Sequence, residues 1–332
     1  MPYMITSDKH YNIVTANDDV KKWYADYSAG NVGENYGKGE HFLGAPVVFC
    51  LDTPEKCDGY LFELFSVGNF KSTISAKTTS NEYSAENLYV NTGYRWSVTG
   101  FKSGEAVFKS EGSFKTEKFP RTINIGGVSN VRDIAFFSPK IKQGMLYRSA
   151  SLDDITLEGK KTVLFDLGIK TDIDLRTRGE GTAGTVSPLG DTVGYFSLPG
   201  AYYVESGASV KDPVFQKNMA EVFKVLADEN NYPTIFHCAI GRDRTGTLAA
   251  ILEILLGATE KDVFADYELS FFSEAGCRDN AAPDMMLGKI TELYEFLRSY
   301  GGGSVRENVE KYLGDIGVFP EEIENIKKIM TK

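Results

Sequence analysis

The chain has 332 residues, more than one ordinary domain needs, which favours two domains. Hydrophobic residues make up 42% and charged residues 25%, so the composition is globular and wholesale disorder is excluded. The formal net charge of −10 argues against nucleic acid or anionic membrane as the main partner. No apolar run approaches the ~18 residues of a transmembrane helix, so no integral membrane segment is expected. Residues 1–20 lack a signal-peptide pattern, which leaves a secreted, surface or cytoplasmic location open.

Cysteines and histidines are few. Four cysteines are too few for a disulfide scaffold. Cys50 and Cys57 could pair in an oxidising compartment, and the alternative is one buried and one surface thiol. The three histidines, His10, His41 and His237, are scattered without metal-ligand spacing. The sequence therefore predicts no metal site and no cofactor.

The first 120 residues have the pattern of a β-rich domain. Residues 1–40 are expected to form an arm or long loop with little structure. Short alternating runs, separated by Gly, Asn, Asp and Pro, then predict a β-sandwich over residues 41–119. Its aromatic residues are expected in the core rather than on a ligand platform. The predicted strands cover residues 46–51, 60–67, 72–80, 94–101 and 106–116.

One segment of this half, LYVNTGYRWSV at residues 88–98, is more specific. In Greek-key sandwiches a tyrosine near the start of a late strand bonds back to the upstream backbone. Tyr94 fits this position, and Trp96 and Val98 would then face the same side of the strand. The segment resembles fibronectin type III and immunoglobulin-like domains.

Beyond residue 120, strand-like runs alternate with helical ones, which predicts an α/β domain over residues 120–332. Thr156 is a candidate cap for a helix that begins near Leu157, and Ser304 with Glu307 forms a capping box. The expected strands are residues 170–177 and 232–238. The expected helices include residues 214–229, 245–257, 285–300 and 319–331, with another that starts near residues 259–262.

The sequence HCAIGRDRTG at residues 237–246 lies between an apolar strand and an apolar helix. A loop at this junction directs backbone N–H groups and a helix N-terminus at one point, which makes an anion-binding cradle. Arg244 follows Cys238 by six positions, and its guanidinium can bind two oxygens of a phosphate. The predicted substrate-binding residues are Ala239, Ile240, Gly241, Arg242 and Gly246, and for Arg242 the alternative is a solvated charge.

The same loop predicts nucleophilic chemistry. A helix N-terminus and neighbouring cations favour the thiolate form of a cysteine, so Cys238 is expected to attack phosphorus and form a phosphocysteine. The cradle and Arg244 would stabilise the transferring phosphoryl group without a metal. Thr245 is placed to donate to the sulfur and help it leave. The alternative is a buried structural cysteine in an ordinary turn, or a sulfur-transfer loop of the rhodanese type.

At these residues the chain resembles the protein tyrosine phosphatases, whose signature is Cys-x5-Arg-Ser/Thr. It is most similar to the bacterial tyrosine/serine phosphatases with the loop HCxAGKDRTG. Matching segments are SNVRDIAF at 129–136, GMLYRSASL at 144–152 and GIKTDIDLRTRGE at 168–180, so the resemblance covers about residues 121–275. Arg242 replaces the usual lysine, Ile240 replaces the usual alanine, and the Gly-Gly after the Arg-Asp pair is missing. The resemblance implies an α/β cysteine-phosphatase fold with a central, mostly parallel sheet.

The leaving oxygen needs a proton donor. Both tryptophans lie in the first half, so the familiar Trp-Pro-Asp acid loop is absent. Asp243 is the leading candidate for the acid and Asp174 the second, with Glu205 and Asp212 in reserve. The role favoured for Asp174 is to hold the loop or pair with an arginine, and the acid role is its alternative. The expected supporting residues are His237, Asp174, Arg176, Arg132 and Asp133.

These observations predict a phosphomonoester hydrolase, most simply a protein tyrosine phosphatase with or without dual specificity. The alternatives are a phosphoinositide or inositol phosphate phosphatase, and a catalytically silent domain that binds phosphorylated partners. The partner is therefore a phosphorylated protein, phospholipid or inositol phosphate. Since all candidate catalytic residues lie later, a protein beginning near residue 118 is expected to fold and hydrolyse aryl phosphates.

Overall fold

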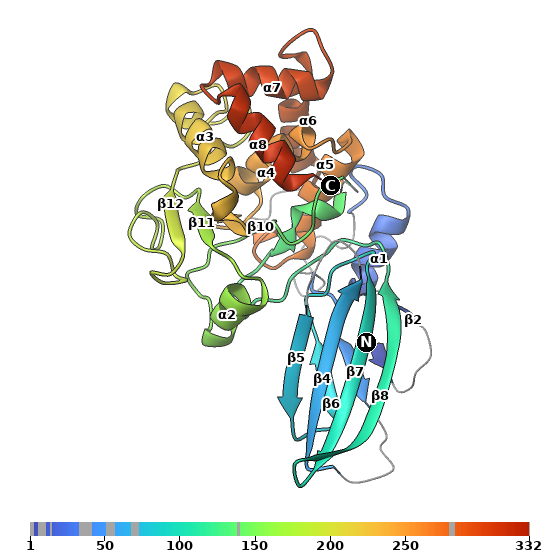
Figure 1. Cartoon of the computed structure of the whole chain (residues 1–332). Coiled ribbons are helices and arrows are strands. Elements are labelled where there is room, and N and C mark those ends of the chain that lie inside the picture. Colours follow the sequence, from blue (N-terminus) through green and yellow to red (C-terminus); the bar gives the residue numbers. More distant parts are fainter. Residues whose placement is uncertain are drawn as a thin grey trace. The chain divides into compact units, whose positions relative to one another are not determined.

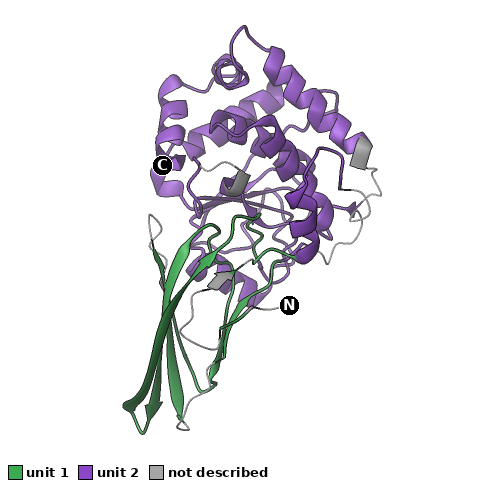
Figure 2. Ribbon diagram, turned by 90° about the vertical axis from the view of Figure 1, so that its right-hand side faces the viewer, with its two compact units in different colours: residues 1–17, 44–123 green, residues 18–43, 124–332 purple. Residues whose placement is uncertain are grey.

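The computed structural model describes residues 3–5, 11–13, 15–32, 42–50, 57–67, 73–137, 140–278 and 283–331; His10 and His41 lie outside them. Contacts divide the chain into two compact units (Figure 2). Unit 1 contains residues 1–17 and 44–123, and unit 2 contains residues 18–43 and 124–332. This division differs from the sequence-based boundaries at residues 40 and 119, because residues 18–43 belong with the later half.

Unit 1 consists of two sheets. The larger has the order β2-β8-β7-β4-β5 and the smaller the order β1-β3-β6. All five predicted strands are present, while the first two strands and β6 were not predicted. The strands are β1 (Tyr3–Ile5), β2 (Tyr11–Ile13), β3 (Val47–Cys50), β4 (Gly59–Val67), β5 (Thr73–Thr78), β6 (Glu82–Ala85), β7 (Gly93–Lys102) and β8 (Glu105–Thr116).

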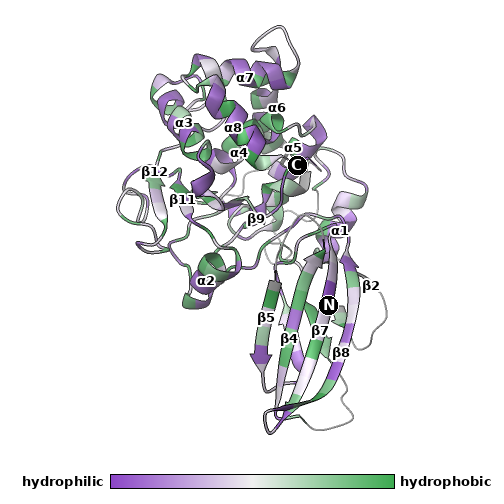
Figure 3. Cartoon of the chain, in the orientation of Figure 1, coloured by the Kyte–Doolittle hydropathy of each residue, from purple (hydrophilic) through white to green (hydrophobic). Residues whose placement is uncertain are grey.

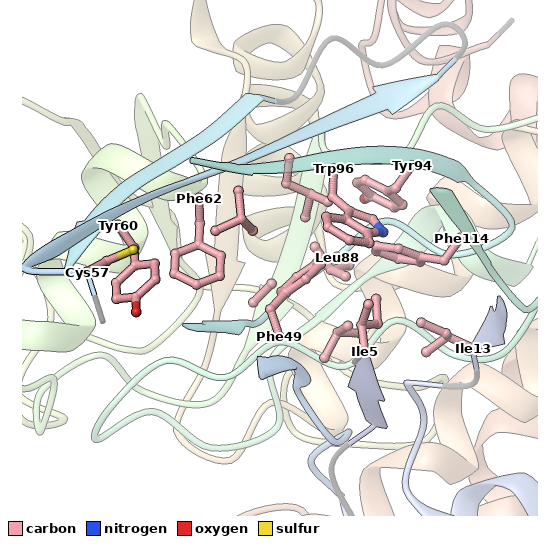
Figure 4. Close-up of a cluster of buried hydrophobic side chains, with 14 residues drawn as sticks. Ile5, Ile13, Phe49, Cys57, Tyr60, Phe62, Leu88, Tyr94, Trp96 and Phe114 are labelled. Atoms are coloured by element: carbon pink, nitrogen blue, oxygen red, sulfur yellow. The ribbon is translucent and has the colours of Figure 1, made fainter. Parts of the chain in front are cut away.

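The core of unit 1 follows from alternation along these strands. In β4 and β7, buried residues alternate with more exposed ones, and hydropathy alternates along the same strands in Figure 3. Phe49 from the smaller sheet lies against Trp96 from the larger sheet, with ring centroids 5.6 Å apart (Figure 4). The aromatic residues drawn there are buried, as the sequence predicts.

The predicted tyrosine contact is also present. The backbone N–H of Tyr89 donates to the hydroxyl of Tyr94 at 2.8 Å, and Tyr94, Trp96 and Val98 are all buried on one face of β7. Cys50 and Cys57 are present as separate thiols rather than as a disulfide. Cys57 is buried and Cys50 is partly exposed.

Unit 2 contains a five-stranded sheet of order β12-β11-β13-β10-β9. All neighbouring pairs are parallel except β10 and β9, so the predicted α/β fold with a mostly parallel central sheet is confirmed (Figure 1). The strands are β9 (Arg132–Asp133), β10 (Leu146–Ser149), β11 (Thr171–Asp174), β12 (Gly194–Ser197) and β13 (Thr234–His237).

The predicted helices surround this sheet with their caps in place. Thr156 accepts from the N–H of Gly159, and the capping boxes of Thr259 with Asp262 and of Ser304 with Glu307 both form. No helix of the described part of the chain is long and apolar enough to cross a bilayer. The helices are α2 (Leu157–Lys161), α3 (Pro213–Leu226), α4 (Asp243–Leu255), α5 (Glu260–Leu269), α6 (Pro283–Ser299), α7 (Val305–Asp315) and α8 (Pro320–Met330), with short turns η2 (Ile134–Phe137), η3 (Thr162–Asp166), η4 (Glu229–Asn231) and η5 (Ser270–Phe272).

The prediction of little structure before residue 40 is wrong for much of the described part. Helix α1 (Asp18–Ala25) belongs to unit 2, and Trp23 lies 5.1 Å from the ring of Phe272. Tyr27 donates to Glu268 on α5 at 2.5 Å, and the N–H of Gly30 donates to the same carboxylate at 2.9 Å. Helix α1 is short and contains several charged residues, so its few apolar residues do not form a clear helical pattern. The sequence therefore did not indicate a packed helix here.

Candidate functional site

The candidate loop begins where β13 ends and leads directly into α4, so the predicted strand–loop–helix arrangement is present. Cys238 is the first residue after the strand and is 2% exposed. Helix α4 starts at Asp243, and its N-terminus therefore faces the loop. The residues from Ala239 to Arg242 form the turn between them.

Three loop carbonyls are bound by residues from one region of unit 2. The Ala239 carbonyl accepts from the Ser151 N–H at 3.2 Å, and the Ile240 carbonyl accepts from Asn130 Nδ2 at 3.0 Å. The Gly241 carbonyl accepts from Arg148 Nη2 at 2.8 Å. In a trans peptide the N–H of the next residue points opposite to the carbonyl.

The N–H groups of Ile240, Gly241 and Arg242 consequently point away from these three anchors. Three backbone donors at a helix N-terminus suit the oxygens of a bound phosphate. Gly241 is required by the same geometry, since its φ is +71° and an added Cβ would lie 2.6 Å from the backbone of Ser149.

Arg244 is bound by the carboxylate of Glu180, a residue of the motif GIKTDIDLRTRGE that was not predicted as part of the site. Its Nη1 and Nη2 donate to Oε1 and Oε2 of Glu180, both at 2.8 Å. A guanidinium has five N–H donors, so three remain for a phosphate. Hydrogen bonds from Arg244 lower the pKa of Glu180 to about 2. Burial lowers the pKa of Arg244, but its hydrogen bonds to Glu180 and the negative charge of that carboxylate outweigh the effect of burial and raise the pKa overall.

Thr245 lies in the first turn of α4. Its side chain is fully buried, and its hydroxyl has no hydrogen-bond partner among the described residues. A buried hydroxyl without a partner is costly, and a ligand or a reacting group that supplies one would remove that cost. Thr245 is therefore available for the predicted interaction with the sulfur, although the structure does not form it.

Arg242 was predicted to bind substrate, with a solvated charge as the alternative, and the structure shows neither environment. Its side chain is only 3% exposed. Its Nε donates to Asp243 Oδ1 at 2.9 Å, and its Nη1 donates to the Gly276 carbonyl at 2.9 Å. The Arg242 guanidinium thus braces the loop, while its backbone N–H points away from Arg148, the residue that binds the preceding carbonyl.

Gly246 was also predicted to bind substrate, and this is corrected. Its N–H donates to the Arg242 carbonyl at 2.8 Å inside the first turn of α4, so it is not available to a phosphate. A Cβ at this position would lie 3.0 Å from the ring of Tyr267. Gly246 permits close packing of α4 against α5.

His237 ends β13 immediately before the cysteine. Its Nε2 lies 3.0 Å from Asp172 Oδ1, and its Nδ1 lies 3.9 Å from Asp174 Oδ1. Burial lowers the pKa of His237, but the carboxylates of Asp172 and Asp174 outweigh it and raise the pKa. The imidazole therefore links the end of β13 to β11.

Asp174 and Arg176 form a buried pair. Asp174 Oδ2 accepts from Arg176 Nη2 at 2.9 Å and from the Tyr195 hydroxyl at 3.0 Å. Burial raises the pKa of Asp174, but hydrogen bonds from Arg176 and the nearby His237 lower it overall. Since Asp174 is fully buried and bound by donors, its environment fits the holding role rather than the acid role.

Arg132 and Asp133 form β9, the edge strand of the sheet next to β10. Arg132 Nε donates to Asp266 Oδ1 at 2.7 Å, and Arg148 binds the other oxygen of Asp266. Asp133 accepts from the N–H groups of Ala135 at 2.9 Å and Gly144 at 2.6 Å. Asp266 thereby joins Arg132 to Arg148, the residue that anchors the Gly241 carbonyl.

The structure adds four residues to those that the sequence analysis assigned to the site. Glu180 and Arg148 stand in the quoted motifs GIKTDIDLRTRGE and GMLYRSASL, so a signal for both existed. Asn130 stands in the motif SNVRDIAF, two residues before Arg132. Tyr203, whose hydroxyl contacts Asp243 at 2.5 Å, lies in a loop that matched no motif. In the part of the chain that the structure describes, no three His, Cys, Asp or Glu residues are grouped as metal ligands.

Comparison with known proteins identifies the family of unit 2. A family model described as "Tyrosine phosphatase family" matches residues 123–332, which is more than half of the chain. A tyrosine-protein phosphatase from Nostoc commune is 27% identical over 223 residues, covering 54% of this chain and 72% of the relative.

Solved structures with similar segments are more distant. The catalytic core of the PP-IP phosphatase Siw14 from S. cerevisiae is 16% identical, covering 43% of this chain and 78% of its own, with a TM-score of 0.30. TpbA from P. aeruginosa, in complex with pTyr, is 19% identical, covering 45% and 86%, with a TM-score of 0.27.

Proposed function

Because the chain belongs to the tyrosine phosphatase family, we propose that unit 2 hydrolyses phosphate monoesters with Cys238 as nucleophile. The observation that carries this proposal is the paired fork of Arg244 and Glu180 beside the cysteine loop. It fixes a guanidinium whose remaining donors suit two phosphate oxygens. The three inward N–H groups supply the remaining contacts.

In the first step the Cys238 sulfur forms a bond to phosphorus while the bond from phosphorus to the leaving oxygen breaks. The electron pair of that bond goes to the leaving oxygen, which takes a proton from Asp243. In the second step a water oxygen attacks phosphorus, Asp243 takes a proton from that water, and the sulfur leaves as thiolate. Thr245 donates to the departing sulfur, while Arg244 and the loop N–H groups bind the phosphoryl oxygens.

The substrate that we propose is a phosphotyrosine protein. The buried Arg242 guanidinium donates to Asp243 and to the Gly276 carbonyl, so it is not available to bind a second phosphate group of the substrate. A singly phosphorylated substrate fits this arrangement better than an inositol polyphosphate. The Nostoc commune relative, a tyrosine-protein phosphatase by name, supports the same choice.

A substrate panel tests the proposal. The full chain is assayed with phosphotyrosine peptides, phosphoserine peptides, phosphoinositides and an activated aryl phosphate. Highest kcat/KM on phosphotyrosine peptides supports the proposal, and comparable rates on phosphoserine would add dual specificity. Preference for phosphoinositides would replace the substrate but keep the chemistry. Binding of phosphopeptides without hydrolysis of any substrate would instead identify a silent binding domain.

A further inference from the structure

Tyr203 is held in an unusual backbone conformation against the start of α4. Its φ is +56°, a value that residues other than glycine seldom adopt. Its N–H donates to the Thr247 hydroxyl at 3.1 Å, and its carbonyl accepts from the Val210 N–H at 3.0 Å. These two bonds hold the loop after β12 so that the phenol reaches the catalytic loop. The side chain is 4% exposed, so the phenol is shielded from water.

The phenol is the middle member of a buried chain of hydroxyl groups. Its oxygen lies 2.5 Å from Asp243 Oδ1 and 2.5 Å from the Tyr267 hydroxyl. Because Tyr203 has one proton and donates it to Asp243, Tyr267 must donate to Tyr203. Burial raises the pKa of both phenols, so both keep their protons and act as donors.

The two oxygens of Asp243 are consequently unequal. Oδ1 accepts from the Tyr203 hydroxyl at 2.5 Å and from Arg242 Nε at 2.9 Å, whereas among the described residues Oδ2 accepts one longer hydrogen bond, from Arg242 Nη2 at 3.4 Å. A neutral carboxyl has one acceptor oxygen and one O–H group. Two donors on Oδ1 select it as the acceptor and leave the proton on Oδ2. The Asp243 side chain is 25% exposed, so the carboxyl is not enclosed.

We propose that Tyr203 is the positioning residue of the general acid: it fixes Asp243 Oδ1 as acceptor and so places the transferable proton on Oδ2. This inference rests on the proposed function, in which Asp243 protonates the leaving oxygen. Tyr203 itself does not touch the substrate. Tyr203, which lies in a loop that matches no recognised motif, would thus orient the general acid in a chain that has no Trp-Pro-Asp loop.

The test compares leaving groups. Protonation matters most for a poor leaving group such as an alkyl alcohol and little for an acidic phenol. For Tyr203→Phe we expect kcat on a phosphotyrosine peptide, whose phenol is a poorer leaving group than that of an activated aryl phosphate, to fall about tenfold, as loss of one hydrogen bond to the neutral carboxyl allows. On an activated aryl phosphate kcat should change by less than about threefold, with KM unaltered on both. The matched control is Tyr202→Phe, the neighbouring residue, which should behave like the wild type.

Two further variants close the test. Tyr267→Phe removes the donor to Tyr203 and should show the same selective loss, so the proposal stays testable if Tyr203→Phe unfolds. Adding Tyr203→Phe to Asp243→Asn should cause no additional selective loss. Equal losses on both substrates, or fully additive losses in the double variant, would overturn the positioning role. If the wild type hydrolyses neither phosphate, the proposed function itself fails, whereas a normal wild type with an unselective Tyr203→Phe refutes only this inference.

Discussion

Arg244 and Glu180 are joined by two parallel hydrogen bonds of 2.8 Å, although they are 64 residues apart in sequence. Glu180 follows strand β11, and Arg244 lies in the first turn of α4. The pair sets the orientation of a guanidinium that would otherwise rotate about a long flexible side chain. It therefore links the loop after β11 to the start of α4, next to the Cys238 loop.

Glu180→Gln should weaken the fork without removing the arginine. We expect kcat/KM on an aryl phosphate to fall about tenfold, corresponding to about 1.4 kcal/mol, because one charge-assisted contact becomes neutral. Affinity for an inhibitory oxyanion such as vanadate should fall in parallel. The control is Glu158→Gln, whose carboxylate pairs with Lys161 on the surface. Equal effects of the two variants would contradict a role for the fork.

Gly246→Ala tests the packing of α4 on α5. The added methyl group would lie 3.0 Å from the Tyr267 ring, so we expect a destabilisation of about 1–3 kcal/mol in denaturant unfolding. The control is Gly314→Ala in α7, where no atom lies within 4 Å of the added Cβ. That variant should stabilise the chain by up to about 1 kcal/mol. An unchanged stability of Gly246→Ala would show that the two helices can separate freely.

Unit 2 should tolerate loss of unit 1 but not of residues 18–43. The Gly44 N–H donates to the Thr122 hydroxyl at 3.1 Å, so in a protein that begins at residue 18 a short Gly-Ser linker can replace residues 44–123. We expect that protein to fold and hydrolyse aryl phosphate. A protein beginning near residue 118 lacks Trp23 and Tyr27 and exposes Phe272 and Glu268, so it should melt at lower temperature. Equal melting of the two proteins would refute a structural role for the N-terminal segment.

Acid should destabilise unit 2 through its paired carboxylates. Burial raises the pKa of Asp153, but Arg176 and Thr182 outweigh it and lower the pKa to about 2, as Arg244 does for Glu180. Their ordinary values are 3.8 and 4.5, so both groups contribute stability above these values and lose it as pH falls toward about 2. Melting temperatures measured over this range should fall, and Asp153→Asn should fall less steeply. A flat profile in the wild type would contradict the ion pairs.

The elements that local signals define were predicted well. The caps at Thr156, Thr259 and Ser304 and the turn at Gly241 depend on neighbours within a few residues, so the sequence indicates them directly. The Cys238 loop was found because its strand, turn and helix are contiguous.

What was missed depends on long-range contacts. The buried state of Arg242 requires the Gly276 carbonyl, and the packing role of Gly246 requires Tyr267 on another helix. Tyr203 gave no local signal because its φ of +56° is imposed by bonds to Thr247 and Val210. Residues 18–32 form a short segment with many polar side chains, and only its contacts with α5 and η5 show that it is packed.

Acid quenching during turnover is the most direct test of the phosphocysteine intermediate proposed for Cys238. The full chain is mixed with an activated aryl phosphate, quenched in acid within the first turnover, digested and examined by mass spectrometry. We predict one phosphoryl group on the peptide that contains Cys238, and its absence from Cys238→Ser, which should still bind vanadate but not turn over. Turnover that persists in Cys238→Ser, or a phosphoryl group trapped on another residue, would contradict the mechanism.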